Sequence, residues 1–311
     1  MNKIEYLRVI LTERCNLSCF FCHREGEYEI VKQENKQEDL LQMIRLCIEN
    51  GTKKLKFLGG EPTLVQWLPD IIRAIRSEFK NIDISVVSNG ITQESVIMRL
   101  INSGIDRVNI SLHGFDNRLF HEITHGTDGQ LDLLFSSISL LQEHGKLGKL
   151  NYVILKGVNE QEFFDVINFA NEHKLVLDVL NYIGTDVDEV ARLRYSFEEI
   201  IDIISSKYVI KEKCKYINPY SLSSTRLFLE AGGIVNLKTT ELNSTDCFYS
   251  CSICKIKEFC TEGIKAIRLT PNGKLRPCVF RDDNCFDFLW SLKNKGKVET
   301  NNMLRKYLEQ L

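Results

Sequence analysis

Three cysteines on one short segment constrain this chain more than any other feature of its sequence. Cys15, Cys19 and Cys22 have the spacing C-x3-C-x2-C, and they follow an apolar, β-branched run over residues 4–11. The asparagine, serine and glycine residues around them favour irregular backbone over helix. We therefore expect a loop at the C-terminal end of a first strand, where α/β folds place their chemistry.

The number of thiols indicates what this loop binds. An iron–sulfur cube usually takes four cysteine thiolates, so a loop with three leaves one iron open to a small molecule. Zinc sites favour pairs of C-x2-C units or added histidines, and His23 is the nearby candidate for a fourth ligand. The pattern favours an iron–sulfur cluster, with a zinc knuckle or ordinary buried thiols as alternatives.

The cysteine run, with Phe21 directly before its last member, resembles the signature of the radical S-adenosylmethionine (SAM) superfamily. The resemblance implies a 4Fe-4S cluster on Cys15, Cys19 and Cys22, whose open iron binds the amino and carboxylate groups of SAM. It further implies that the reduced cluster breaks a C–S bond of SAM and gives a 5′-deoxyadenosyl radical, which abstracts hydrogen from a substrate. A reducing partner such as flavodoxin or ferredoxin is expected with this chemistry.

Composition fits an enzyme of this kind. The 311 residues are 43% hydrophobic and 26% charged, as in ordinary globular proteins. A formal net charge of −2 argues against general affinity for nucleic acid or anionic membrane. The sequence has no apolar run of the roughly 20 residues that a membrane span needs and no signal-peptide layout. We expect a cytoplasmic enzyme whose 11 cysteines bind metal rather than form disulfides.

The first 185 residues alternate β-like runs with helical patterns, which is typical of βα units around a parallel sheet. The expected strands are 5–12, 54–58, 82–88, 107–112, 149–156 and 175–183. Six units predict an α/β fold with a partial (β/α)6 TIM-like barrel over residues 1–185. A small C-terminal cysteine-rich region with an auxiliary cluster is expected over residues 186–311.

Polar residues follow several of these strands. In the segment Gly59-Gly60-Glu61-Pro62, paired glycines let backbone approach a ligand and the carboxylate could pair with an ammonium group. The superfamily resemblance implies that SAM is held here, with Glu61 binding its amino group. The implied cofactor-binding residues are Phe21, Gly59, Gly60, Glu61, Ser88, Asn89 and Ser111. His113 is as readily a structural histidine as a functional one.

The resemblance narrows over five segments that together resemble the GTP 3′,8-cyclase family, a family of lyases: 6–8, 12–14, 23–26, 106–113 and 153–159. That family binds a polyphosphate with basic residues, which implies a substrate-binding set of Arg8, Lys54, Lys56, Lys156 and Arg268. The chain departs from the family at Asp178 and Ala266, which replace arginines. Its last residues replace a Gly-Gly tail and predict an amphipathic packing helix around 303–311.

A second group of cysteines lies near the C-terminal end. The family resemblance implies an auxiliary 4Fe-4S cluster on the pair Cys251 and Cys254 and on Cys278, which follows an Asn-Gly turn. In the family, substrate binds this cluster's open iron. Here an inserted segment carries Cys260, which we predict as a fourth ligand that closes the cluster, with Cys247, Cys285 or substrate as alternatives.

Three functions compete. The first is cyclisation or rearrangement of a phosphorylated, nucleotide-like small molecule. The second is modification of a ribosomally made peptide, which a closed auxiliary cluster and the lost arginines would favour. The third is a non-catalytic iron–sulfur sensor or partner-binding protein, which would leave the GGEP segment unexplained. Residues 184–231 predict only a helix at 198–206, and Cys214 is expected to be a buried apolar thiol.

Overall fold

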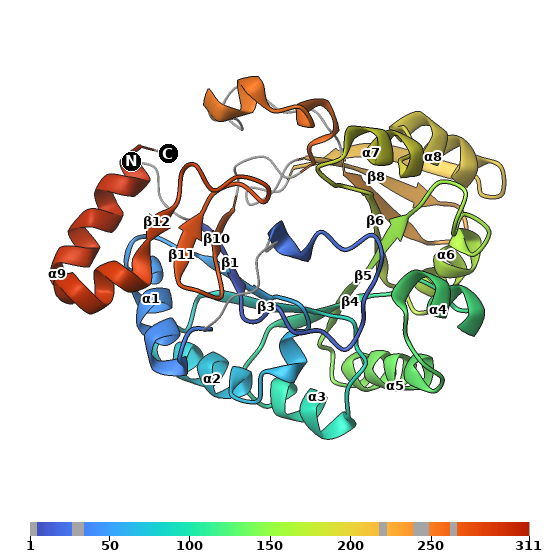
Figure 1. Ribbon diagram of the computed structural model, residues 1–311. Helices are drawn as coiled ribbons and strands as arrows, with labels where there is room; N and C mark the ends of the chain where they lie inside the picture. The colour runs from blue at the N-terminus through green and yellow to red at the C-terminus, as the bar shows by residue number, and fades with distance from the viewer. Residues whose placement is uncertain (1–4, 27–33, 218–222, 239–248, 262–265, 311) are drawn as a thin grey trace.

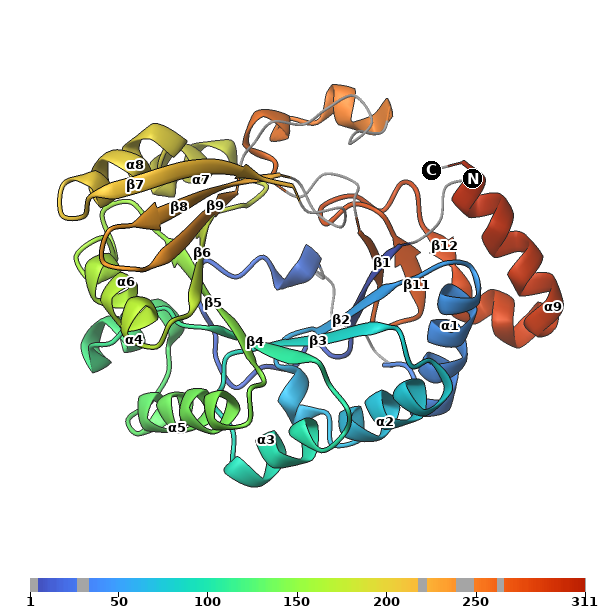
Figure 2. The same cartoon turned by 180° about the vertical axis from the view of Figure 1, so that it is seen from behind.

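The computed structural model describes residues 5–26, 34–217, 223–238, 249–261 and 266–310. These residues contain one sheet of 12 strands in the order β12-β11-β10-β1-β2-β3-β4-β5-β6-β9-β8-β7. The sheet curls into a barrel with helices on its outer side (Figures 1 and 2). This confirms the predicted α/β barrel.

Each of the six expected strands is present, with bounds close to those predicted. They are β1 (Tyr6–Ile10), β2 (Lys54–Leu58), β3 (Asp83–Ser88), β4 (Arg107–Ser111), β5 (Leu147–Ile154) and β6 (Val176–Asn181). All neighbouring pairs among them are parallel.

Two further parallel strands, which the sequence pattern did not predict, come from the C-terminal part of the chain. β9 (Ile234–Lys238) pairs with β6, and β10 (Ile267–Leu269) pairs with β1 on the opposite side. Antiparallel strands continue the sheet beyond both: β7 (Ile210–Tyr216) and β8 (Ser224–Leu229) beside β9, and β11 (Lys274–Arg276) and β12 (Phe286–Asp287) beside β10. The division of the chain at residue 185 stays a prediction.

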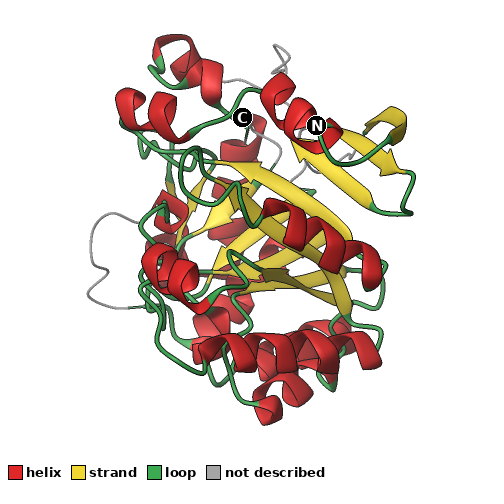
Figure 3. Ribbon diagram, turned by 90° about the vertical axis from the view of Figure 1, so that its right-hand side faces the viewer, coloured by secondary structure: helices red, strands yellow, loops and turns green. Residues whose placement is uncertain are grey.

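The helices surround the sheet, as the side view in Figure 3 shows. They are α1 (Gln37–Glu49), α2 (Leu68–Glu78), α3 (Glu94–Ile101), α4 (Asn117–Thr124), α5 (Gln130–Glu143), α6 (Phe163–Glu172), α7 (Val187–Leu193), α8 (Phe197–Ser205) and α9 (Phe288–Glu309). α8 begins with a capping box formed by Ser196 and Glu199, which satisfies the first backbone N–H groups of the helix. Among the described residues, no helix is long and apolar enough to cross a membrane.

The C-terminal helix is longer than the sequence pattern indicated. α9 begins 15 residues before Met303, because Asp287 caps its first turn through a bond from the Trp290 N–H. A left-handed glycine, Gly296 with φ +73°, separates its two straight parts. Leu304 and Leu308 are buried as predicted, whereas Leu311 lies outside the described residues.

Side-chain alternation along the strands leaves the barrel interior polar. On β2, Leu55 and Phe57 are fully buried in the hydrophobic core beneath the helices. Lys54 and Lys56 point the opposite way and line an internal cavity. Cys214 was expected in the core, but this prediction is wrong. It is only half-buried, because β7 is the last strand of the sheet and has a solvent-facing side.

A buried arginine connects the C-terminal strands to the cysteine loop. Arg276 on β11 is 3% exposed, and its guanidinium donates to the carbonyl oxygens of Glu25 at 2.7 Å and Gly26 at 3.0 Å. Gly26 has φ +83°, and an added Cβ there would lie 1.6 Å from the Val279 carbonyl oxygen. A side chain at position 26 would therefore prevent these two segments, about 250 residues apart in sequence, from meeting as they do.

We predict that Arg276→Met lowers the free energy of unfolding by about 1.5 to 3 kcal/mol, because two buried carbonyls lose a charged donor. Urea denaturation followed by circular dichroism would measure it. Arg73→Met is the matched control, since Arg73 forms an exposed ion pair with Asp70 and its loss should cost under about 1 kcal/mol. Equal effects of the two substitutions would contradict the proposed connection.

Candidate active site

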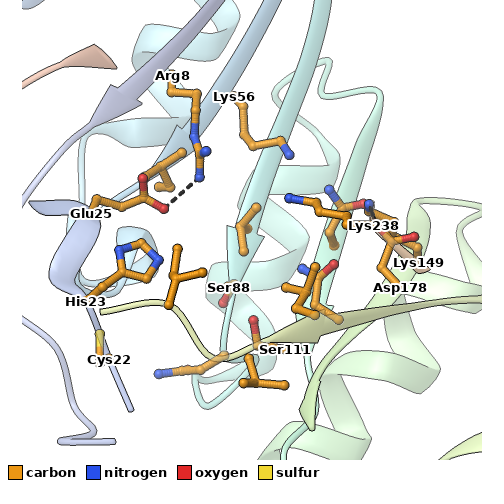
Figure 4. Close-up of a pocket in the computed structure, with 18 of the residues that line it drawn as sticks. Arg8, Cys22, His23, Glu25, Lys56, Ser88, Ser111, Lys149, Asp178 and Lys238 are labelled. Atoms are coloured by element: carbon orange, nitrogen blue, oxygen red, sulfur yellow. Dashed lines mark hydrogen bonds and ion pairs between the residues drawn. The ribbon is translucent and has the colours of Figure 1, made fainter. Parts of the chain in front are cut away.

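One cavity of about 710 Å³ occupies the barrel interior. The cysteine loop and the C-terminal ends of the strands line one part of it. Charged residues from β2, β4, β5, β6 and β9 line another part. Figure 4 shows Cys22 and His23 on one side of this space, with Lys56, Lys149 and Lys238 pointing into it from the other.

Backbone contacts hold the cysteine loop in place. The N–H groups of Ser18 and Phe20 donate to carbonyls at the end of α4, at 2.9 and 3.1 Å. Asn16 donates to the carbonyl of Ile91, after β3, at 2.8 Å. The loop therefore crosses the barrel mouth between β3 and α4.

All three cysteines of this loop line the cavity. Backbone N–H groups point at two of their sulfurs, from Leu17 to Cys15 and from Arg24 to Cys22, each at 3.4 Å. Such N–H···S contacts are typical of iron–sulfur ligands. Burial raises the pKa of Cys15 to about 11 and that of Cys19 to about 12, so the thiols ionise only when a metal binds them.

The donor set fits a cluster with several irons better than a single ion. Within the described ranges, no three His, Cys, Asp or Glu side chains converge tightly enough to share one metal ion. A 4Fe-4S cube does not need such convergence, because each cysteine ligates a different iron. Three thiols around one cavity satisfy this requirement.

Glu61 organises the turn after β2. Its carboxylate is 1% exposed and accepts three hydrogen bonds: from the Ser88 hydroxyl at 2.8 Å, the Asn89 N–H at 2.8 Å and the Thr63 N–H at 2.9 Å. Burial raises the pKa of Glu61, and these donors offset part of the rise. The carboxylate thereby connects the turn after β2 to the end of β3, and the Ser88 hydroxyl group donates its hydrogen to Glu61.

The two glycines before Glu61 permit contact with the cysteine loop rather than only with a ligand. An added Cβ would lie 2.5 Å from the Thr12 carbonyl oxygen at Gly59 and 2.1 Å from that of Arg14 at Gly60. The N–H groups of Gly60 and Glu61 donate to these same two carbonyls at 2.7 Å. The GGEP turn thus supports the loop that carries the cysteines.

Phe21 and Ser111 also line the cavity. The Phe21 ring meets His113 edge-on, with ring centroids 4.8 Å apart. Burial lowers the pKa of His113 to about 4, so this imidazole is neutral at physiological pH. All seven residues that the resemblance implied for the cofactor line the same cavity as the three cysteines. Two of them also contact each other, since the Asn89 backbone N–H donates to the Glu61 carboxylate.

Three of the five expected substrate residues line the cavity: Arg8, Lys54 and Lys56. Arg8 donates to Glu25 at 2.6 Å, so an internal carboxylate already faces this arginine. Lys54 and Lys56 lie over the Tyr6 ring at 5.0 and 5.7 Å from its centroid.

The other two expected substrate residues do not line it. Lys156 is 45% exposed and pairs with Glu199 on α8 at 2.7 Å. Arg268 is 1% exposed, donates to the Pro277 carbonyl and lies 3.5 Å from the Glu25 carboxylate. The assignment of Lys156 to substrate is not supported by this geometry, and Arg268 acts on Glu25 instead.

Five cationic residues that the sequence reasoning did not assign to the site line the cavity: Arg24, Arg107, Lys149, Arg226 and Lys238. Burial lowers the pKa of Lys149 well below its usual range, and Lys56 and Lys238 lower it further. Lys149 lies on a predicted strand, so the alternation of inward and outward residues could have identified it. Arg226 and Lys238 lie on β8 and β9, which the sequence pattern did not predict.

Asp178, where the family resemblance implied an arginine, forms an internal network. Its carboxylate pairs with Lys149 and accepts a bond from Asn236 at 2.9 Å. Asn236 in turn accepts from Arg226 at 2.9 Å. The anion therefore binds two cavity residues, and the unfavourable charge expected there is compensated by Lys149.

Three of the described C-terminal cysteines have neighbours in common. The Phe280 N–H points at the Cys278 sulfur at 3.5 Å, and Phe280 shares a small cavity with Cys260. Arg281 pairs with Asp283, and the nearby sulfurs of Cys254 and Cys278 further raise its pKa. Cys285 instead lies 3.8 Å from Asp282, and Cys247 is outside the described residues.

The sequence and the fold together define the class of protein. The model of the radical SAM superfamily matches residues 9–170, and the chain belongs to this superfamily. It is therefore a radical SAM enzyme, a class that uses a 4Fe-4S cluster and SAM. A probable GTP 3′,8-cyclase of Metallosphaera sedula is 35% identical over 300 residues, covering 94% of this chain and 86% of that protein. A probable GTP 3′,8-cyclase of Methanocella arvoryzae is 32% identical, covering 98% and 90%.

Solved structures support the fold. Streptococcus suis SuiB bound to the precursor peptide SuiA has a TM-score of 0.63 at 18% identity, covering 90% of this chain. The chain spans 60% of the SuiB chain. The structure of anSMEcpe with bound AdoMet has a TM-score of 0.59 at 15% identity, covering 96% of this chain and 82% of that one.

We predict that Glu61→Gln lowers the free energy of unfolding by about 1 to 3 kcal/mol. The amide nitrogen would face an N–H or O–H donor and leave it unsatisfied. Urea denaturation measures the change. Glu94→Gln is the control, because Glu94 is exposed and accepts one bond from Ser136. A loss no larger than that of the control would contradict the organising role of Glu61.

Proposed function

We propose that this enzyme reductively cleaves SAM and abstracts hydrogen from a phosphorylated, nucleotide-like small molecule, which then cyclises or rearranges. The observation that carries the proposal is one cavity with the three-cysteine loop on one side and a group of inward cations on the other. The names of the relatives, probable GTP 3′,8-cyclases, are consistent with this substrate class.

Cys15, Cys19 and Cys22 would hold the catalytic cluster. When bound, that cluster supplies the electron that cleaves SAM to a 5′-deoxyadenosyl radical. The polypeptide positions and encloses the reactants: Phe21, Gly59, Gly60, Ser88, Asn89 and Ser111 border the space in which SAM would lie. Glu61 keeps this border rigid through its three hydrogen bonds. Enclosure in the barrel keeps the radical from water and positions one C–H bond near it.

Cations on β2, β5 and β9 would bind the anionic end of the substrate. Lys56 and Lys238 both lie close enough to Lys149 to lower its pKa. Lysines bind phosphate as compact point charges, and their mutual repulsion falls when an anion binds between them. Arg8 would join them if the substrate displaces Glu25.

The auxiliary cysteines would hold a second 4Fe-4S cluster. We propose Cys251, Cys254, Cys260 and Cys278 as its four ligands, since Cys260 and Cys278 both adjoin Phe280. A cluster with four thiolates has no open iron, so it would transfer electrons or support structure. A flavodoxin or ferredoxin is proposed as the external reductant.

A peptide substrate is the alternative. It would leave the inward lysines without an anionic partner from the substrate, so we favour the phosphorylated small molecule. The response of the lysine variants below distinguishes the two.

We predict that anaerobically reconstituted, dithionite-reduced enzyme cleaves SAM to 5′-deoxyadenosine and contains about eight irons. The triple variant Cys15→Ala, Cys19→Ala, Cys22→Ala should lose cleavage and keep about four irons on the second cluster. Chromatography of 5′-deoxyadenosine and colorimetric iron analysis measure both. Unchanged cleavage by the triple variant would reject the catalytic assignment, and loss of all iron would reject two independent clusters.

We predict that Lys238→Ala raises the Michaelis constant for GTP by roughly 10- to 100-fold, because a charge-assisted contact contributes about 1.5 to 3 kcal/mol. SAM cleavage without substrate should stay nearly unchanged. Lys156→Ala is the matched control, and it should leave the Michaelis constant as in wild type because Lys156 faces Glu199 outside the cavity. A similar rise for both variants, or for neither, would contradict the proposed phosphate site.

A further inference from the structure

Four polar side chains on one wall of the cavity make no side-chain hydrogen bond to the residues that the structure describes. Asn109, Ser111 and His113 lie at alternate positions along and just beyond β4, and Asn151 lies beside Ser111 on β5. We call this set the β4–β5 wall. Asn109 is 2% exposed, and Asn151 and His113 are each 9% exposed. The Asn109 Oδ1 and His113 Nδ1 atoms are enclosed without a hydrogen-bond partner.

A β-bulge on the neighbouring strand lies beside Asn109. Val108 pairs with Leu147 but Asn109 pairs with Lys149, so Gly148 is an extra residue on β5. An added Cβ at Gly148 would lie 2.5 Å from Asn109 Oδ1. Asn109 points into the cavity with Arg107 and Ser111 because alternate residues of a strand share a face, and Gly148 leaves room for its amide against the barrel wall.

The wall lies between two sets of residues that are already hydrogen-bonded. On the β3 side, Ser88 and Asn89 bind Glu61. On the β6 side, Asp178 binds Lys149 and Asn236. Buried polar groups are nearly always paired, and an unpaired one in a native cavity needs an explanation. A bound ligand is the explanation that accounts for several such groups on one wall.

The position of the wall indicates which part of a ligand it would meet. Asn109 is opposite Lys149, and Asn151 is opposite Asp178, so both amides border the cation group. Ser111 and His113 continue the row toward Phe21 and the cysteine loop. The wall therefore spans the distance between the proposed phosphate site and the proposed site of hydrogen abstraction.

The chemistry of the wall suits neutral hydroxyl groups. An amide offers a donor and an acceptor on one planar group, and a hydroxyl can satisfy both. Neither Asn109 nor Asn151 carries charge, so they add nothing for a phosphate. In a nucleotide-like molecule, the hydroxyl-bearing group next to the phosphates is the sugar.

We propose that Asn109 and Asn151 form a subsite that hydrogen-bonds the sugar hydroxyls of the substrate. This inference rests on the proposed function, a phosphorylated nucleotide-like substrate. The subsite holds the sugar between the cation group and the cysteine loop, which presents one face of the ring to the loop. The two asparagines thereby determine which C–H bond of the sugar is accessible.

The test measures equilibrium binding of five probes to the anaerobic, cluster-containing enzyme by calorimetry: SAM, GTP, 2′-deoxy-GTP, 3′-deoxy-GTP and inorganic tripolyphosphate. At least one deoxynucleotide should bind wild type about tenfold more weakly than GTP, which corresponds to one lost hydrogen bond of about 1.4 kcal/mol. Asn109→Ala and Asn151→Ala should each bind GTP about tenfold more weakly and no longer distinguish it from that deoxynucleotide. Tripolyphosphate binding should not change. Asn50→Ala, which removes an amide on the outer surface near Asn301, is the control and should behave as wild type.

Other results overturn the inference. Equal weakening of GTP and tripolyphosphate would indicate a purely structural role, and unchanged preference between GTP and both deoxynucleotides would exclude hydroxyl recognition. Weakened SAM binding with unchanged GTP binding would place the sugar of SAM, and not of the substrate, on this wall. Should Asn109→Ala fail to fold by circular dichroism, Asn109→Ser and Asn151→Ala carry the same test. Failure of wild type to bind either GTP or tripolyphosphate would contradict the proposed function itself, whereas intact binding without hydroxyl preference contradicts only this subsite.

Discussion

The buried carboxylate of Glu61 is the interaction on which the rest of the site depends. It accepts hydrogen bonds from its own turn and from the end of β3, while its backbone N–H donates to the cysteine loop. One residue thus fixes three segments that are distant in sequence. A buried carboxylate is costly unless all its acceptor positions are used, so the same bonds that satisfy Glu61 also prevent the loop, the GGEP turn and β3 from moving independently.

Charge within the barrel sets a second constraint. Inward lysines and arginines repel one another in a partly desolvated space, and internal carboxylates offset part of this repulsion: Glu25 faces Arg8, and Asp178 faces Lys149. Both carboxylates border the cavity, so an anionic ligand would compete with them. At Asp178, where the family resemblance implied an arginine, the carboxylate offsets the charge of Lys149, and Lys238 on β9 is a further cation in the lining.

The C-terminal part of the chain completes the barrel on both sides. β9 extends the parallel sheet beyond β6, and β10 extends it beyond β1. β9 brings Lys238 and Asn236 to the cavity, and the hairpin after β10 brings Arg276 to the cysteine loop and Cys278 toward Cys260. Cys278 therefore follows a strand of the same sheet that lines the cavity.

Local sequence determined the repeating βα pattern, the six N-terminal strands and the loop with Cys15, Cys19 and Cys22, because hydrophobic period and motif spacing act over short distances. Most of the implied cofactor residues could be found this way, since they directly follow predicted strands. Only the tertiary structure decided that Lys156 faces Glu199, that Arg268 supports Glu25, and that Lys149 and Lys238 line the cavity. These outcomes depend on ion pairs between distant segments and on two strands that join the sheet from the C-terminal region. The bulge at Gly148, which leaves room for Asn109, is likewise a feature of strand pairing. The local sequence around a lysine does not show whether its side chain points into the barrel or into solvent, because the pairing of its strand decides that direction.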